Sequence, residues 1–416
     1  MHYTSEANQM EKKQQFAMLG LFLSMVLIDL ASSNAIAAEV KEPYKIGMSA
    51  ARTGPAAVSY TPGSEGIRVY IEKINEAGGI NGRPIKLMIE DDGGVATKAG
   101  SNIKKFAEAG AHLVTVASVS ATYGPAIAEA KRANIPILFG AGSVSPKESL
   151  PPNPEPLVFA TSDKGMLADP HRGVETISQI ASKLGIKQVI IGIVVMDIPV
   201  AMGIAQRMKI LAEKKGWGVI MSPIPPGAVD LTAVAAKWIE RGVNFGIESG
   251  PTVARLMYPA LMKRGWKGNF VILYEAFNYL TDIKADNLYA ICSVTPLEMM
   301  NLPEHKEIVA ASKKYKASIV LTENLWGWDT GKVLEKILRQ AGWPLTTKKF
   351  LEVMNDFECD NRPLARLHKW TPNDHLGSLV WRAYKWDKKI RQVVPVTDWR
   401  RSSATGEIVE KVVPKL

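Results

Sequence analysis

The residues that first suggest chemistry are glycines followed by carboxylates, in the stretch INEAGGINGRPIKLMIEDD from Ile74 to Asp92. A glycine-rich loop can cradle phosphate groups, and a pair of carboxylates can bind a metal ion. A phosphate-binding loop, however, needs Gly-x4-Gly-Lys-Ser/Thr, and a dinucleotide-binding loop needs Gly-x-Gly-x-x-Gly at the start of a helix. The stretch contains neither pattern, so it does not predict a nucleotide site.

The same glycines fit the end of a helix and the turn that follows it. The spacing of isoleucines predicts a helix over residues 67–77, and Gly78 or Gly79 can adopt the left-handed conformation that ends a helix. Residues 81–82, Asn-Gly, predict a tight turn into a strand that begins near Ile85.

Asp91 and Asp92 end that predicted strand. A metal site is one reading of the pair, but we expect these carboxylates to be solvated or to cap the next helix. The six histidines and two cysteines are scattered without the spacing of metal ligands. We therefore expect neither a metal ion nor a cofactor.

Two further segments place hydroxyl groups where helices are expected to begin. Ser120 follows a predicted strand over residues 113–118, and Ser143 follows another over residues 135–140. The first turn of a helix offers free N–H groups and the positive end of the helix dipole, which suits an anion. Serines in this position are also common as simple helix caps. The segment GAGSVS, which contains Ser143, lacks the third glycine of a dinucleotide loop.

Elements that could position these residues alternate along the chain. Short apolar runs alternate with helix-period stretches, which is typical of βαβ units around mainly parallel sheets. After Cys292 the pattern predicts helices over 304–316, 324–340 and 347–355, followed by a strand-rich tail. The predicted strands cover residues 44–49, 85–90, 113–118, 135–140, 188–195, 218–222, 245–248, 270–274 and 288–294.

The N-terminus has the pattern of a secretory signal peptide. Two lysines precede an apolar run over residues 16–30, and an Ala-x-Ala site at 35–37 follows. A membrane anchor is the alternative, although the run is short for a bilayer span. We expect residues 1–38 to be removed and the protein to reside in the periplasm. The net charge of +10 comes from dispersed lysines and arginines, so we expect no nucleic-acid partner.

Cys292 and Cys359 are the only cysteines. An oxidising compartment would allow a disulfide between them, with two separate buried thiols as the alternative. The separation of their Cα atoms, which the sequence does not give, decides between the two.

Four sequence blocks resemble one known family. The first runs MSAARTGPAAVSYTPGSEGIRVYIEKINEAGGINGRPIKLMIEDDGG, and the others are ANIPILFGAGSVSP, VMDIPVAMGIAQRMKILAEKKGWGV and YPALMKRGWKGNFVILYEA. Together they resemble the periplasmic binding proteins for branched-chain amino acids, the Leu/Ile/Val-binding family of ABC importers. The resemblance covers nearly the whole chain after the signal peptide.

This resemblance implies the type I periplasmic binding protein fold: α/β, two Rossmann-like lobes with mainly parallel sheets, three crossings between the lobes, and a ligand in the cleft. We expect lobe one to comprise residues 39–161 and 295–360, and lobe two residues 162–294 and 361–416. In that arrangement both cysteines lie near crossings, where a disulfide would tether the hinge.

The resemblance also implies which residues bind the ligand. The family's serine and its Ala-x-Thr segment, which bind the α-carboxylate and part of the α-ammonium group, match Ser120 and residues 141–143. The family's acid against the ammonium group matches Glu275, and two tyrosines could pack on the ligand. The predicted ligand-binding residues are Ser120, Tyr123, Ala141, Gly142, Ser143, Tyr274 and Glu275.

Two departures from the family bear on specificity. Pro251 or Thr252 stands where many relatives carry tyrosines, and Pro199 and Ala201 stand near another such position. These changes weaken the case for leucine and leave aromatic acids, amides and other small metabolites open. Three further residues, Trp326, Trp328 and His375, are more typical of core or structural positions, although the tryptophans could line the mouth of a cleft.

The sequence lacks the Gly-x-Ser-x-Gly and HExxH motifs of hydrolases, so we expect no catalysis. The expected function is that of a periplasmic, monomeric solute-binding protein. It would close on an amino acid, aromatic acid or amide and present it to an inner-membrane ABC permease. A periplasmic ligand sensor on the same fold, or an exported enzyme, are the alternatives.

Overall fold

The computed structural model describes residues 41–161, 168–249, 253–273, 277–299, 302–318, 322–362, 364, 366–377, 380–402 and 408–411. The chain divides into two units, residues 1–43 and 44–416, and the second unit carries the architecture described below. The predicted signal peptide lies outside the described residues. Within those residues, every helix is too short or too polar to span a bilayer.

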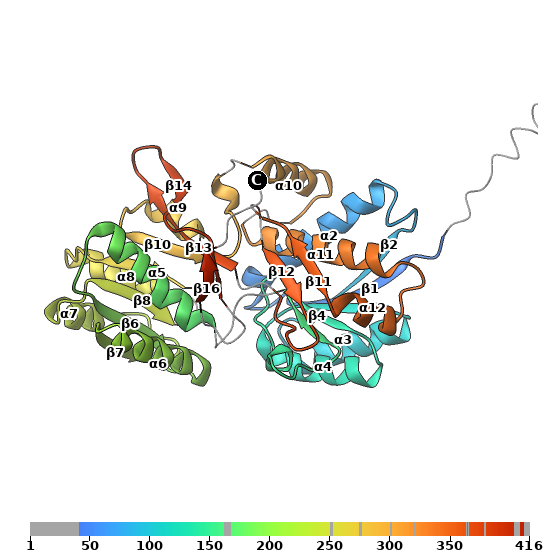
Figure 1. Ribbon diagram of the computed structural model, residues 1–416, viewed down its shortest axis with the longest axis horizontal. Helices are drawn as coiled ribbons and strands as arrows, with labels where there is room; N and C mark the ends of the chain where they lie inside the picture. The colour runs from blue at the N-terminus through green and yellow to red at the C-terminus, as the bar shows by residue number, and fades with distance from the viewer. Residues whose placement is uncertain are drawn as a thin grey trace, which may run out of the picture. The chain divides into compact units, whose positions relative to one another are not determined.

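Residues 44–160, coloured blue to green in Figure 1, contribute a five-stranded parallel sheet with the order β2-β1-β3-β4-β5. Its strands are β1 (Tyr44–Ala50), β2 (Ile85–Asp91), β3 (Leu113–Ala117), β4 (Ile137–Phe139) and β5 (Val158–Ala160). The helices between them are α2 (Ala57–Glu76), α3 (Ala96–Glu108) and α4 (Tyr123–Arg132).

Both faces of this sheet are covered, which explains its continuous apolar strands. In β3, Val114 and Val116 pack in one cluster with residues of α3 and α4. Leu113 and Ala117 point to the opposite face and pack in the cluster that includes α2. Side chains alternate between the faces of a strand, so one short apolar run serves two cores.

The second sheet has nine strands in the order β16-β15-β13-β10-β9-β8-β6-β7, with β14 paired to β13. The pairings among β6 to β10 are parallel, whereas β13 joins β10 antiparallel. The strands are β6 (Ile190–Met196), β7 (Gly218–Ile224), β8 (Phe245–Ser249), β9 (Asn269–Ile272), β10 (Leu288–Cys292), β13 (Val380–Asp387), β14 (Gln392–Pro395), β15 (Arg400–Ser402) and β16 (Ile408–Lys411).

Helices also cover both faces of the second sheet. In β6, Ile191 and Ile193 pack in one cluster with residues of α5 and α6, and Val194 packs in another with residues of α7 and α8. The bounds of the helices are α5 (Ala168–Leu184), α6 (Pro199–Lys214), α7 (Thr232–Glu240), α8 (Val253–Lys263) and α9 (Phe277–Ile283). The chain is therefore an α/β protein with two mainly parallel sheets that form two lobes.

Between β10 and β13 the chain forms α10 (Pro303–Lys314), α11 (Asn324–Ala341), α12 (Thr347–Met354) and a hairpin of β11 (Phe357–Asp360) and β12 (Leu367–Trp370). Helix α11 packs along α2, and glycines make the contact. A Cβ atom on Gly327 would lie 1.9 Å from the carbonyl oxygen of Gly63, and one on Gly66 would lie 2.2 Å from that of Asn324. The two backbones approach so closely that no side chain fits between them.

Most sequence predictions of secondary structure are confirmed, including all nine strands, the three helices after Cys292 and the strand-rich tail. Gly78 and Gly79 have φ of 95° and 74°, and Asn81 and Gly82 have φ of 52° and 76°, as the helix end and the turn require. The strands β5, β11, β12, β15 and β16 were not predicted.

The predicted start of the first helix at residue 67 is wrong. Helix α2 begins at Ala57 and continues through Pro62 and Gly63, residues that normally interrupt a helix. Gly63 is buried, and a Cβ atom there would lie 2.4 Å from the carbonyl oxygen of Ala141. Close packing in this region overrides the local preference of the two residues.

The two cysteines are separate thiols. Cys292 in β10 and Cys359 in β11 are both free and buried. Burial raises the pKa of the Cys359 thiol to about 12, so this side chain stays protonated and unreactive at neutral pH.

Two buried histidines should make stability depend on pH. Burial lowers the pKa of His305 and of His375 below the ordinary value of 6.5. The unfolded chain then takes up protons at a higher pH than the folded chain, so stability is fully present above about pH 6.5 and is lost as the pH falls through the folded pKa. We expect the free energy of unfolding to fall below pH 6.5, by up to about 1.4 kcal/mol per pH unit for each histidine.

Urea unfolding at pH 7.5 and pH 5.5 tests this expectation. The variant His375→Gln keeps a donor for the carbonyl oxygen of Val158, which the imidazole contacts at 2.9 Å, but cannot be protonated in this range. It should lose less stability between the two pH values than the wild type does. Equal losses in both proteins would contradict the assignment.

Candidate functional site

The order of strands in the first sheet creates a natural place for a ligand. Strand β1 lies between β2 and β3, so the connections after β1 and after β3 run to opposite sides. In open α/β sheets ligands bind outside the carboxyl ends of the strands at such a switch point. The loops concerned are residues 51–56 after β1 and residues 118–122 after β3.

Asp92 holds the ends of these strands together. Its side chain is fully buried and accepts hydrogen bonds from the hydroxyls of Ser49 at 2.8 Å and Ser118 at 2.7 Å, and from the backbone N–H of Gly94 at 2.8 Å. One carboxylate thereby joins β1, β3 and the loop after β2. The prediction that Asp92 is solvated or caps the next helix is wrong, because Val95 precedes α3 and Asp92 organises the loops instead.

Asp91 has a similar role in the loop after β1. It accepts hydrogen bonds from the backbone N–H groups of Arg52 at 2.9 Å, Thr53 at 3.2 Å and Gly93 at 2.9 Å, and from the hydroxyl of Thr53. Burial alone would raise the pKa of Asp91, but these hydrogen bonds outweigh it and hold the pKa below its usual value. Among the described residues, no three His, Cys, Asp or Glu side chains are grouped so that they could hold a metal ion.

Ser143 is a structural residue in this conformation. It is fully buried; its hydroxyl donates to the carbonyl oxygen of Val116 at 3.0 Å and accepts from the backbone N–H of Ser118 at 3.1 Å. The hydroxyl therefore joins the loop after β4 to the end of β3. Its neighbours Ala141 and Gly142 have φ of 51° and 90°, and a Cβ atom on Gly142 would lie 2.7 Å from the ring of Trp326.

Tyr123 is also part of the core. Its ring is 5% exposed and packs against Phe139 with a centroid distance of 4.5 Å, and its hydroxyl donates to the carbonyl oxygen of Ser118 at 3.2 Å. Burial raises the pKa of this phenol well above its usual value. The ring is therefore committed to the interior.

Ser120 differs from these residues because it is exposed at the switch point. It opens a short 3-10 helix, Ser120–Thr122, that leads directly into α4. Two apolar side chains lie beside the loop after β2 at this edge: a Cβ atom on Gly94 would lie 3.4 Å from Val119, the neighbour of Ser120, and 3.6 Å from Ala56. The first sheet thus presents one hydroxyl-bearing residue of the predicted set beside apolar side chains.

The second sheet has its own switch point, because β6 lies between β7 and β8. Pro199 begins α6 directly after β6, and Ala201 is buried. Glu248, near the end of β8, is also buried and accepts from the backbone N–H of Ala254 at 2.7 Å. The predicted residues Pro251, Thr252, Tyr274 and Glu275 lie outside the described residues.

The aromatic residues considered earlier are structural, as the sequence suggested. Trp326 and Trp328 are 4% and 1% exposed in α11. His375 stacks on Phe159 with a centroid distance of 3.9 Å. The backbone N–H of Ala160, in β5, donates to the carbonyl oxygen of His375. The chain at residue 375 is therefore in contact with the first sheet.

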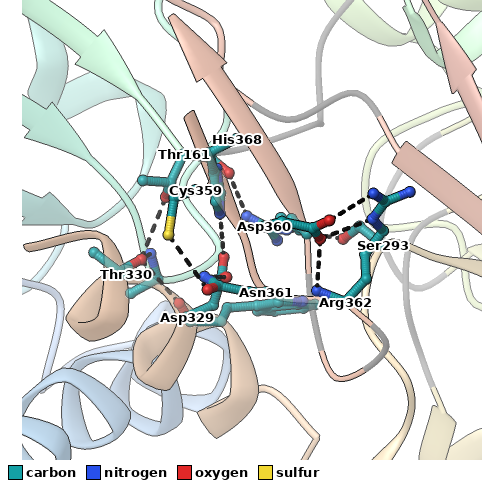
Figure 2. A network of polar contacts seen from close by, with 12 residues as sticks. Thr161, Ser293, Asp329, Thr330, Cys359, Asp360, Asn361, Arg362 and His368 are labelled. Carbon is teal, nitrogen blue, oxygen red and sulfur yellow. Dashed lines mark hydrogen bonds and ion pairs between the residues drawn. The ribbon is translucent and has the colours of Figure 1, made fainter. Parts of the chain in front are cut away.

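A buried polar network, which the sequence predictions missed, joins α11 to the hairpin of β11 and β12 (Figure 2). Asp329 in α11 accepts from the side-chain amide of Asn361 at 2.6 Å and contacts Nε2 of His368 at 2.8 Å. Burial alone would raise the pKa of Asp329, yet the contact with His368, the charge of Arg366 and the hydrogen bond from Asn361 hold the pKa below its usual value. The available signal was an aspartate on the buried stripe of an amphipathic helix.

Comparison with known proteins agrees with this architecture. The family described as periplasmic binding protein matches residues 43–390. A fatty acid ABC transporter substrate-binding protein from Thermomonospora curvata has 19% identity and a TM-score of 0.68, over 88% of this chain and 94% of that one. An amino acid ABC transporter substrate-binding protein from Pseudomonas fluorescens Pf-5 has 13% identity and a TM-score of 0.73, over 89% and 100%.

A possible leucine/isoleucine/valine-binding protein from Rhodopirellula baltica SH 1 has 17% identity and a TM-score of 0.65, over 88% of this chain and 98% of that one. At these identities the likeness concerns the fold alone. The comparison with curated protein sequences gives no match. The family match covers most of the chain, and it agrees with the two mainly parallel sheets and their switch points. The chain belongs to the periplasmic binding protein family.

Proposed function

We propose that the protein is the solute-binding component of an ABC importer, which captures a small amino acid or a related carboxylate or amide without transforming it. The family match over residues 43–390 is the observation that carries this proposal. Two proteins of similar structure, the fatty acid and the amino acid ABC transporter substrate-binding proteins named above, support it. An inner-membrane permease would be the partner.

The ligand would lie between the carboxyl ends of the two sheets, where the switch points are. One wall would be formed by the loops after β1, β3 and β4, and the other by the loops after β6, β8 and β9. We assign residues up to Gly377 to lobe one, beyond the boundary at residue 360 expected from the sequence. The carbonyl contact of His375 with β5 supports this, and Val380 begins a strand of the second sheet.

Two serine substitutions separate ligand contact from structure. We expect Ser120→Ala, at an exposed position, to change the free energy of unfolding by less than about 0.5 kcal/mol while weakening ligand binding about tenfold. Ser143→Ala should cost about 1–3 kcal/mol of stability, because Val116 and Ser118 lose a buried partner. Urea unfolding and calorimetric titration measure the two effects. Unchanged binding in Ser120→Ala would remove this residue from the site.

A substitution at Glu275 tests whether the ligand carries an amine. If its carboxylate faces an ammonium group, Glu275→Gln should abolish the response to amino acids but keep the fold. A variant that still binds amino acids with wild-type affinity would remove Glu275 from that role. Binding only to acids or amides that lack an amine would have the same consequence and would leave the solute-binding function in place.

Export is the remaining part of the proposal. Cleavage after Ala37 or Ala38 would release the chain into the periplasm. N-terminal sequencing of the protein recovered from a periplasmic extract tests this directly. A chain that retains its apolar segment in the membrane fraction would support the anchor instead.

A further inference from the structure

One buried guanidinium contacts two of the connections between the sheets. Arg366 lies in the loop between β11 and β12 and is fully buried. Its Nε donates to the hydroxyl of Ser293 at 3.1 Å, and its Nη1 donates to the carbonyl oxygen of Thr161. Thr161 directly follows β5, the last strand of the first sheet in this part of the chain, and Ser293 directly follows β10 of the second.

Helix α11 holds the loop that carries Arg366. The carboxylate of Asp329 binds Asn361, at the start of that loop, and His368, just beyond its end (Figure 2). The carbonyl oxygen of Leu364, inside the loop, accepts the backbone N–H of Thr295 at 2.7 Å. The loop is therefore tied to α11 on one side and to the connection after β10 on the other.

The next residue of α11 extends the network to the candidate site. The hydroxyl of Thr330 accepts the backbone N–H of Ala141 at 3.2 Å and lies 3.3 Å from the hydroxyl of Thr161. It donates in turn to the carbonyl oxygen of Trp326 at 2.8 Å. Ala141 stands in the loop after β4, which would form part of the ligand-binding wall. The order of contacts is thus Ala141, Thr330, Thr161, Arg366 and Ser293.

We propose that Thr330 and Arg366 form a polar clasp that couples the loop after β4 to the connections at Thr161 and Ser293. This inference rests on the proposed function, because a solute-binding function gives the loop after β4 a ligand to respond to. A shift of Ala141 on ligand binding would change the partners of Thr330, and Thr330 and Arg366 share Thr161 as a contact. The clasp would then set how freely the two lobes move relative to each other.

The charge of Arg366 favours this role over simple packing. Removing a guanidinium from water is costly, and an apolar side chain of similar volume often gives equal or greater stability. A cation is useful here because its planar fork can hold two acceptors on different segments in one geometry. Its acceptors come from the two connections rather than from a single strand.

Hydrogen–deuterium exchange of the ligand-free protein tests the clasp. The variants Ser293→Ala and Thr330→Val each remove one hydroxyl from it. Thr115→Val is the matched control, because the buried hydroxyl of Thr115 donates to the carbonyl oxygen of Leu138 within the first sheet and has no part in the clasp. Arg366→Lys keeps the charge and loses the fork.

We expect exchange in peptides covering residues 157–161 and 293–297 to rise about tenfold in Ser293→Ala and Arg366→Lys, since a net hydrogen bond is worth about this factor. Thr330→Val should raise exchange in residues 140–145 as well. The control should leave residues 293–297 at the wild-type rate. Wild-type rates at residues 293–297 in all three clasp variants, or an equal rise in the control, would overturn the proposal.

Spin labels on the two lobes provide a second readout that a purely structural role would not change. Lys98→Cys in α3 and Lys237→Cys in α7 place labels at exposed positions, while the native cysteines are buried. Ser293→Ala should broaden the distribution of interlobe distances, and Thr115→Val should not. Identical distributions would overturn the clasp. Both experiments use ligand-free protein, so a failed ligand search would count against the proposed function and leave this result intact.

Discussion

Substituting Gly327 by alanine is expected to cost about 3 kcal/mol of folding free energy, one of the two largest effects that the structure predicts. The new Cβ atom would lie 1.9 Å from the carbonyl oxygen of Gly63 and 2.7 Å from the backbone nitrogen of Ile67. Both contacts are with backbone, which cannot rotate away as a side chain can. Helices α2 and α11 would have to separate, and the core between them would lose its packing.

Gly203→Ala is the matched control for this prediction. Gly203 also lies within a helix, α6, but nothing stands within 4 Å of the position of a Cβ atom there. Alanine should therefore be neutral or stabilise by up to about 1 kcal/mol, because glycine is the poorer helix former. Urea unfolding compares the two variants. A Gly327→Ala protein as stable as Gly203→Ala would show that the helices are not in close contact.

Asp329→Ala is expected to cost about 4 kcal/mol, the second large effect. Asp329 and His368 are both fully buried, so removal of the carboxylate leaves the imidazole and the amide of Asn361 without their shared acceptor. The cationic Arg366 also loses the negative charge of Asp329, with which it interacts electrostatically. The loop between β11 and β12 would detach from α11.

The double variant Asp329→Leu with His368→Leu shows whether the cost comes from the broken pair. Replacing both members with apolar groups leaves no unpaired imidazole beside α11, and such changes are often close to neutral. Arg366 keeps its hydrogen bonds to Ser293 and Thr161 in this variant. We expect it to recover at least half of the stability lost in Asp329→Ala, measured by urea unfolding. A double variant that is less stable than the single one would mean that the contact between Asp329 and His368 itself supplies the stability.

The elements of the fold could be predicted well from the sequence because hydrophobic period and turn chemistry are local signals. Asn81 and Gly82 specify a turn by their own conformational preferences, and the buried Leu334, Ile337 and Leu338 recur at helical spacing in the second half of α11. The start of α2 could not be predicted in this way. Pro62 and Gly63 argue for a break, whereas in the structure Gly63 packs against the backbone at Ala141 and the carbonyl oxygen of Pro62 accepts from the side-chain amide of Asn324, two contacts with residues distant in sequence.

The candidate site was less predictable, because the use of a hydroxyl depends on its neighbours in space. Ser120 and Ser143 look equivalent in the sequence, since each follows a strand and precedes a helical segment. Ser143, in the loop after β4, is nevertheless fully buried against the end of β3, whereas Ser120 is exposed. Of these two serines, Ser143 therefore stabilises the loop after β4, and Ser120 can face a ligand.

The polar network illustrates a third case, in which the partners are far apart in the chain. Arg366 reaches Thr161 across 205 positions and Ser293 across 73. No local pattern marks such a contact. The one signal that sequence could offer was the presence of Asp329 among apolar residues of a helix, and it indicates burial without naming the partner.

The most direct test of the central claim is a thermal-shift screen of ligand-stripped, refolded protein. The compounds would be aliphatic and aromatic amino acids, aromatic carboxylates, dicarboxylates, short amides and urea. A ligand that binds only the folded state raises the melting temperature with its concentration. We predict a saturable rise with at least one of these classes, reduced in Ser120→Ala, with the compound recovered unchanged. No rise with any class, or recovery of a chemically altered compound, would contradict the account of the protein as a solute-binding protein.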